Sequence, residues 1–350
     1  MNTNISSFTN LPLPKDIKNI HVCSENIRSF VNKTRESINN ILDKKSFKKL
    51  VIIGPCSIHD YDSAIEYAKY IKQQREKYKD TLEIVMRTYF SKPRTNIGWK
   101  GFVYDPYLDK TNNISAGINL ARKLLLEILN LEVPCCMEHV DTIIPQYFDD
   151  LLSWGAIGAR TSESQIHREL ASGISTPIGF KNNTEGNIDS AIQSIKSSRT
   201  SHCFIGCLSD GNISMITTKG NFHCHVILRG GRHSPNYYRK NIHETIQKLK
   251  ANSIVCNIMV DCSHGNSNKQ YKNQLIVCKD VCEQMSNNKD IIGIMIESNL
   301  IEGNQDINNK PLKYGQSITD SCINLEDSDT LLDMISRTVF TPLKLSDEHF

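Results

Sequence analysis

Gly158-Ala-Arg-Thr-Ser-Glu-Ser-Gln-Ile-His-Arg-Glu-Leu-Ala-Ser-Gly-Ile-Ser-Thr-Pro-Ile-Gly-Phe-Lys181 links two short apolar runs of the chain, and each run closes on a cation. The cations are Arg160 and Lys181. In a parallel α/β fold, residues that leave the carboxyl end of a strand face the active-site mouth. Two cations presented there suit a phosphate or carboxylate group. Taken alone, either cation is better interpreted as half of a surface ion pair.

The same alternation of apolar runs and amphipathic segments continues along the whole chain. Strands are predicted at residues 50–53, 83–87, 135–138, 156–160, 178–181, 224–229, 258–261 and 291–297. Helices are predicted at residues 24–42, 64–71, 115–129, 145–152, 165–172, 187–198, 242–249, 273–285 and 329–335. Residues 202–208 and 214–218 predict a β-hairpin around Asp210-Gly, inserted before the sixth barrel strand.

This pattern predicts an α/β fold, a (β/α)₈ TIM barrel with an N-terminal extension. An open doubly wound sheet would show the same alternation, but it would rarely place reactive groups at so many strand ends. We expect residues 1–45 to form an N-terminal arm and helix, with residues 1–20 irregular. Residues 46–345 are expected to form the barrel as one catalytic domain.

Composition excludes several classes of protein. The 350 residues are 39% hydrophobic and 23% charged, with a net charge of +3, which is unlike a nucleic-acid-binding protein. No apolar run approaches the roughly 20 residues of a membrane span, and the polar N-terminus does not resemble a signal peptide. We therefore expect a cytoplasmic protein. The twelve cysteines form no Cys-x-x-Cys pair, so reduced thiols in the core are expected.

Two sets of side chains recur near the predicted strand ends. The cations suit a doubly charged phosphate together with a carboxylate; they are Arg87, Lys92, Arg94, Arg160, Lys181 and Arg229. A mixed sulfur, nitrogen and oxygen set suits a divalent manganese, iron, cobalt or zinc ion; it comprises Cys56, His264, Glu297 and Asp320. A rival ligand cluster is His223 with His225, for which a structural role is the simpler interpretation.

Nine motifs in order resemble one family. They are Gly54-Pro-Cys-Ser-Ile-His-Asp, Lys92-Pro-Arg-Thr, Gly98-Trp-Lys-Gly, Gly158-Ala-Arg-Thr, His167-Arg-Glu-Leu-Ala-Ser-Gly, Gly179-Phe-Lys-Asn, Leu228-Arg-Gly-Gly, Asp261-x-Ser-His and Tyr314-Gly-x-Ser-Ile-Thr-Asp320. With them the chain resembles the type I 3-deoxy-D-arabino-heptulosonate-7-phosphate (DAHP) synthases of the feedback-regulated bacterial and fungal type. These enzymes perform the first step of the shikimate pathway of aromatic amino-acid biosynthesis.

The resemblance implies a transferase that condenses phosphoenolpyruvate with erythrose 4-phosphate and water, with a divalent metal ion. By position, it assigns phosphoenolpyruvate binding to Arg87, Lys92, Glu138, Ala159, Arg160, Lys181 and Arg229. It assigns erythrose 4-phosphate to Pro93, Arg94 and Thr95, and the metal to Cys56, His264, Glu297 and Asp320. The implied catalytic residues are Lys92, Cys56 and His264. We expect Lys92 to be the proton donor, with a lowered pKa because it stands among arginines.

Two alternatives stay open. A sibling enzyme would use the same phosphoenolpyruvate cage with a five-carbon aldose phosphate, although the Lys92-Pro-Arg-Thr block and the following long loop argue against it. A protein of another class, a catalytically silent subunit, would only bind amino-acid effectors.

The resemblance also implies a homodimer or homotetramer and an amino-acid effector pocket. The pocket would be lined by Pro145, Gln146, Leu170, Ile174, Ser175, Phe204 and Ile216. In the resembling enzymes, acidic residues of a neighbouring subunit's arm help to hold the effector ammonium, whereas residues 1–14 here contain no Asp or Glu. Gly206 also stands where a serine hydroxyl is usual. We therefore expect weak or absent feedback inhibition.

Overall fold

Eight parallel strands close into a barrel in the computed structural model, which describes residues 3–339. Their order around the barrel is β1-β10-β9-β8-β5-β4-β3-β2. Their bounds are β1 Lys49–Gly54, β2 Leu82–Arg87, β3 Cys135–Glu138, β4 Leu152–Ile157, β5 Ile178–Lys181, β8 Cys224–Leu228, β9 Ile258–Asp261 and β10 Ile291–Glu297. The barrel predicted from the sequence is confirmed. The predicted end of the domain at residue 345 lies outside the described residues.

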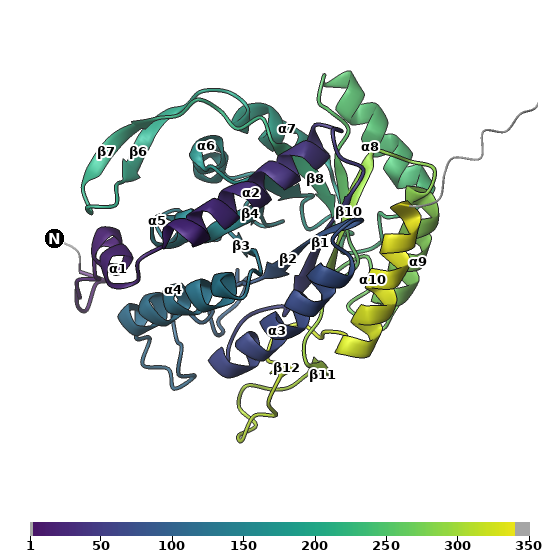
Figure 1. Ribbon diagram of the computed structural model, residues 1–350. Coiled ribbons are helices and arrows are strands. Elements are labelled where there is room, and N and C mark those ends of the chain that lie inside the picture. The colour runs from purple at the N-terminus through teal and green to yellow at the C-terminus, as the bar shows by residue number, and fades with distance from the viewer. Residues whose placement is uncertain (1–2, 340–350) are drawn as a thin grey trace, which may run out of the picture.

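Helices surround the strands and cover their outer faces (Figure 1). Caps that the sequence encodes start several of them: the Asp60 side chain accepts from the Ser63 amide, and Ser24 accepts from Ile27. The bounds are α2 Glu25–Leu42, α3 Tyr61–Lys77, α4 Ile114–Asn130, α6 Gln165–Gly173, α7 Asp189–Ser198, α8 Arg239–Ala251, α9 Asn273–Met285 and α10 Leu325–Val339. In the described part of the chain, no helix has the length and apolar character of a membrane span.

The predicted hairpin is also confirmed. Strands β6 (Cys203–Cys207) and β7 (Ile213–Thr217) pair antiparallel and extend from the barrel beside the N-terminal segment (Figure 1). The turn suits its sequence, because Asp210 accepts from the Asn212 amide and Gly211 has a positive φ of 83°. The Lys15 amide donates to the Ser209 carbonyl over 2.8 Å, which joins the hairpin tip to the N-terminal segment.

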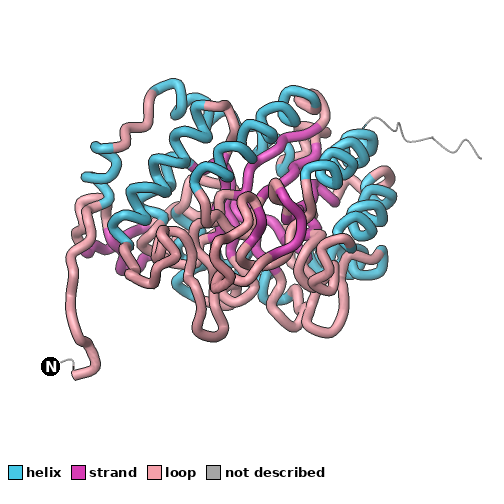
Figure 2. The backbone as a smooth tube through the Cα atoms, turned by 90° about the horizontal axis from the view of Figure 1, so that it is seen from below, coloured by secondary structure: helices cyan, strands magenta, loops and turns pink. Residues whose placement is uncertain are grey.

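The arm was predicted to be irregular to residue 20, and this is wrong for its last part. Helix α1 runs over Pro14–Ile20, with proline in its first turn, Asp16 beside its N-terminus and Ile17 fully buried. Residues 3–13 form a loop that projects away from the body of the molecule (Figure 2).

The fourth strand was misplaced. It was predicted at residues 156–160 after a helix over 145–152, but β4 already begins at Leu152. The helix is only α5 (Pro145–Phe148) followed by the 3-10 turn η1 (Asp149–Leu151). Arginine side chains donate hydrogen bonds to backbone carbonyls between α5 and β4. Arg122 donates to the Tyr147 carbonyl, and Arg35 donates to the Leu152 carbonyl. Arg160 therefore lies in the turn after the strand, as Arg229 does after β8.

One small sheet was not predicted. Strands β11 (Ile301–Asn304) and β12 (Gln316–Ser317) form it between β10 and α10. The cysteines agree with prediction: all twelve are free, and all except Cys203 and Cys207 are buried.

Candidate active site

Charged side chains gather where the barrel strands end. Arg87, Glu138, Lys181 and Glu297 are the last residues of β2, β3, β5 and β10. The long loops gather along one side of the strands in Figure 2. Since parallel strands point the same way, these ends share one mouth.

Three of the four predicted metal ligands lie together. Cys56 Sγ and carboxylate oxygens of Glu297 and Asp320 are all within 4.8 Å of one another. The β1–β10 register pairs Gly54 with Glu297, which brings Cys56 beside the end of β10. The Asp320 loop is tied to the Cys56 turn by the Ser57–Thr319 hydroxyl contact of 2.8 Å. A thiol and two carboxylates suit a borderline divalent ion.

His264, the fourth predicted ligand, lies next to this group. Its Nε2 atom is 3.6 Å from Glu297 Oε1, and its backbone has a left-handed φ of 55°. Such a conformation is uncommon for a residue with a side chain, and it clusters at functional sites. The imidazole therefore lies beside the group of Cys56, Glu297 and Asp320 without being part of it in the described residues.

Asp261 is a site residue that the sequence interpretation missed. It ends β9 and is fully buried, with Oδ2 3.2 Å from Lys181 Nζ and 2.9 Å from His264 Nδ1. These two partners oppose the effect of burial and hold the pKa of Asp261 well below its usual value. The signal was available, since Asp261 closes a predicted strand like the other site residues.

Lys92 was expected to have a lowered pKa, and this is wrong. Its ammonium lies 3.0 Å from Cys56 Sγ, and Asp320 and Glu297 are close by. Burial lowers the pKa of Lys92, but its electrostatic interactions with Cys56, Asp320 and Glu297 outweigh that effect and raise the pKa. Burial, followed by the Glu297 charge, raises the pKa of Cys56 to about 12. The expectation failed because Lys92 also lies near the carboxylates of Asp320 and Glu297, and not only near arginines.

Arg87 is held rigidly at the floor of the site. It is 1% exposed, pairs with Glu297 at 3.0 Å, donates to the Pro55 carbonyl at 3.3 Å, and stacks over the Tyr89 ring at 4.0 Å. A guanidinium fixed by several contacts loses little entropy when it binds an anion.

The outer rim carries the remaining predicted binders. Exposed Arg160 donates from Nε to Thr95 Oγ1 over 2.9 Å, and Arg94 donates to the Trp99 carbonyl over 2.7 Å. Pro93 is half-buried and links this rim to Lys92. Arg160 and Thr95 are therefore neighbours, although the sequence separates them widely.

The Glu138 side chain closely approaches Gly158, the residue before Ala159. A Cβ atom at Gly158 would lie 2.1 Å from Glu138 Oε1, so a larger residue at this position would displace the Glu138 carboxylate. Glu138 is 8% exposed and faces the turn that carries Ala159.

Histidines 223 and 225 are structural. His225 Nε2 accepts from Trp154 Nε1 at 3.0 Å, and burial lowers the pKa of His225 to about 4, which keeps it neutral. His223 lies 3.3 Å from Asp43. Among the described residues, the possible metal-binding group of Cys56, Glu297 and Asp320 includes neither histidine.

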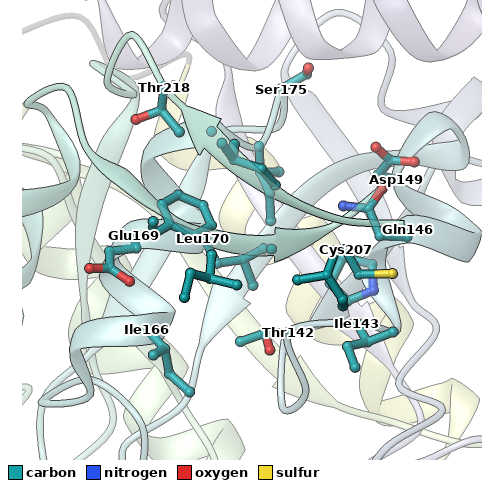
Figure 3. A pocket seen from close by; sticks show the side chains of 18 residues that line it. Thr142, Ile143, Gln146, Asp149, Ile166, Glu169, Leu170, Ser175, Cys207 and Thr218 are labelled. Atoms are coloured by element: carbon teal, nitrogen blue, oxygen red, sulfur yellow. The ribbon is translucent and has the colours of Figure 1, made fainter. Parts of the chain in front are cut away.

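A separate cavity of about 300 Å³ lies between the β6–β7 hairpin, α5 and α6 (Figure 3). Its lining includes all the residues predicted for the effector pocket: Pro145, Gln146, Leu170, Ile174, Ser175, Phe204 and Ile216. It also includes two carboxylates that were not predicted. Asp149 is paired with Lys18 at 2.9 Å, and Glu169 accepts from Gln165 at 2.8 Å.

Comparisons with known proteins agree on one family. The model of the DAHP synthetase I family matches residues 22–333. The phospho-2-dehydro-3-deoxyheptonate aldolase of Haemophilus influenzae is 49% identical over 323 residues, which is 92% of this chain and 89% of the relative. The Phe-sensitive enzyme of that name from Escherichia coli is 49% identical over 90% of this chain and 91% of its own. The solved structure of the enzyme from Francisella tularensis has a TM-score of 0.95 at 46% identity, covering 97% of this chain and 99% of its own.

Proposed function

Because the chain belongs to the DAHP synthetase I family, it is a DAHP synthase, and we propose that the side chains at its barrel mouth carry out the reaction as follows. Carbon 3 of phosphoenolpyruvate forms a bond with the aldehyde carbon of D-erythrose 4-phosphate. Water adds at carbon 2, and inorganic phosphate leaves. The observation that carries this proposal is the convergence of cations and metal-ligand types at one set of strand ends.

Phosphoenolpyruvate is held by the inner cations. Arg87, Lys181 and Arg229 present fixed donors to its phosphate and carboxylate, and Arg160 closes the cage from the rim. The Ala159 backbone and Glu138 complete the pocket. The fixed contacts of Arg87 with Glu297 and Tyr89 support its place in this cage, because they hold the guanidinium in position before substrate arrives.

Erythrose 4-phosphate is held by Pro93, Arg94 and Thr95. The hydrogen bond between Thr95 and Arg160 places this segment beside the phosphoenolpyruvate cage, so the two substrates would lie next to each other. Proximity of this kind removes much of the entropic barrier to joining them.

Lys92 is the proton donor in this proposal. It directly precedes Pro93 and Arg94 in the sequence, and its ammonium lies 3.0 Å from Cys56 Sγ. Its raised pKa keeps it protonated, which is the required starting state for a donor. The proton goes to the oxygen of the former aldehyde as the new carbon–carbon bond forms.

A divalent cation would be held by Cys56, Glu297, Asp320 and His264. The donor set fits manganese, iron, cobalt or zinc, because it combines one sulfur, one nitrogen and carboxylate oxygens. When bound, such an ion supplies Lewis-acid polarisation of an oxygen near the reacting carbons. Asp261 would orient His264 through Nδ1, a common arrangement behind a histidine ligand.

The reaction is tested by release of inorganic phosphate from phosphoenolpyruvate. We expect release with erythrose 4-phosphate, and little with a five-carbon aldose phosphate. Equal or faster release with the five-carbon sugar would contradict the assigned aldose, and no release with either sugar would contradict the proposed site.

Arg160→Ala should weaken phosphoenolpyruvate binding strongly while the barrel still folds. Loss of one charge-assisted contact to phosphate costs about 2–3 kcal/mol, so we expect KM to rise about 30- to 150-fold. Steady-state kinetics and the thermal melting temperature measure the two effects. Arg199→Ala, a cation that packs over Phe222 elsewhere on the chain, is the matched control. An unchanged KM in Arg160→Ala would remove Arg160 from the cage.

We propose that the cavity of Figure 3 binds an amino-acid effector weakly or not at all. An ammonium needs a carboxylate or several acceptors when it leaves water. Residues 3–14 contain no Asp or Glu, and the two carboxylates of the cavity already have the partners Lys18 and Gln165.

Phenylalanine, tyrosine and tryptophan should therefore inhibit only at high concentration. Titration of each amino acid into the phosphate-release assay measures this, with Phe204→Ala as a control for binding in the cavity. Strong inhibition of the parent at low micromolar concentration, lost in Phe204→Ala, would show that Asp149 or Glu169 replaces the missing acids.

We propose a cytoplasmic homodimer or homotetramer, in which residues 1–45 extend a single catalytic domain. The outward face of the hairpin supports self-association, because Ile205, Ile213 and Met215 are each more than 70% exposed there. An exposed apolar face of this kind marks an interaction surface.

A further inference from the structure

Three buried asparagines join the loops that follow β5, β8 and β9. Asn182, Asn236 and Asn266 are 0%, 7% and 2% exposed, and each comes from a different loop. Those loops begin directly after Lys181, Leu228 and Asp261, and they carry Arg229 and His264. A buried amide must find partners for its donors and its acceptor, so its contacts report what it holds in place.

Asn236 contacts all three loops. Its Oδ1 accepts from the Gly230 amide at 2.8 Å, and its Nδ2 donates to Asn182 Oδ1 at 3.1 Å. Its backbone amide donates to Asn266 Oδ1 at 2.8 Å. Asn266 in turn donates to the carbonyls of Leu228 and Asp261, at 3.0 and 2.9 Å.

The network ends on the backbone of Arg229. Asn182 Oδ1 accepts from the Arg229 amide at 2.8 Å, and the Arg229 carbonyl accepts from the Gly265 amide at 3.0 Å. The backbone N–H of Arg229 is therefore bonded to the loop after β5, and its backbone C=O is bonded to the loop after β9. These two hydrogen bonds fix the backbone from which the Arg229 side chain extends.

The loops have no room to adjust separately. A Cβ atom at Gly230 would lie 2.4 Å from the Gly265 carbonyl carbon, and Gly230 has a left-handed φ of 76°. A Cβ atom at Gly265 would lie 2.6 Å from the Gly231 oxygen. Since the backbones are in direct contact, a shift of one loop displaces the other.

We propose that Asn236 is a positioning residue for phosphoenolpyruvate, acting through Asn182 and Gly230 on Arg229. This inference rests on the proposed function of Arg229 and Lys181 as phosphoenolpyruvate ligands. Only an amide can do this work, because Asn236 must accept from a backbone N–H and donate to a carbonyl-type oxygen at once. An aspartate would place one oxygen against Asn182 Oδ1, and an alanine would leave both buried partners unpaired.

The test compares binding and turnover in Asn236→Ala and Asn236→Asp. Calorimetric titration of the manganese-loaded enzyme with phosphoenolpyruvate alone should show Kd raised about tenfold, the equivalent of one lost hydrogen bond. KM should rise in parallel, while kcat falls less than about threefold. Asn257→Ala is the matched control, because that buried amide donates to the Leu42 carbonyl away from the mouth. It should lower the melting temperature and leave Kd unchanged.

A double-mutant cycle separates positioning from general stability. In an Arg229→Ala background, Asn236→Ala should no longer change Kd, because the group through which it acts has been removed. Equal effects of Asn236→Ala in both backgrounds, an unchanged Kd in the single variant, or failure of both Asn236 variants to fold would overturn the proposal. A parent enzyme that does not bind phosphoenolpyruvate would instead overturn the proposed function.

Discussion

Removal of the divalent ion is expected to abolish DAHP formation, and added manganese, cobalt or iron should restore it. The ion supplies several kcal/mol of charge stabilisation, so the loss should exceed about 100-fold. Phosphate release after treatment with a chelator, followed by addition of one metal at a time, measures both steps.

Cys56→Ala should prevent this rescue. Among the described residues, the possible metal-binding group consists of Cys56, Glu297 and Asp320, and Cys56 supplies its only sulfur. Direct metal binding, measured by equilibrium dialysis, should fall together with activity. Cys224→Ala is the matched control, since that buried thiol lies at the start of β8, at the opposite end of the barrel. Full activity of Cys56→Ala in the presence of chelator would refute the assigned metal site.

Lys92→Met should lower kcat by about 10²- to 10⁴-fold, the usual contribution of a positioned acid. The methionine has similar length but neither charge nor proton. Lys92→Arg separates the two roles, because it retains a positive charge near Cys56 but holds its proton too tightly to donate it. We therefore expect Lys92→Arg to recover KM for phosphoenolpyruvate and not kcat. Recovery of kcat by arginine would show that Lys92 acts through charge alone.

The barrel could be predicted from the sequence because its signals are local. Each buried strand is a short apolar run, and the reactive residue that ends it stands next to that run. Prediction failed where no Gly or Pro separates two elements: the stretch Phe148-Asp-Asp-Leu-Leu152 joins α5 to β4. Arginine contacts from distant elements accompany the end of α5, and no local pattern records them.

The site could be predicted as a set of residues but not as an electrostatic environment. Lys92 stands near Arg87 and Arg94 in sequence, whereas in space it lies beside the Cys56 thiol and interacts with the carboxylates of Asp320 and Glu297. Likewise, nothing in the sequence around Asn236 distinguishes it from any other asparagine in a loop. Its role depends on two loops that are distant in sequence, and no local pattern records their contact.

The closure of the barrel by β1 and β10 has a consequence for the order of events during synthesis. A chain emerges from the ribosome with its N-terminus first, so Cys56 is made early and waits unpaired while most of the barrel is translated. Its partners Glu297 and Asp320 arrive near the end, and β10 must still pair with β1 to bring them together. Such a contact between distant parts of the chain is slow to form. The proposed site for the ion therefore cannot form until β10 and the Asp320 loop have been made, so that metal capture would follow closure of the barrel.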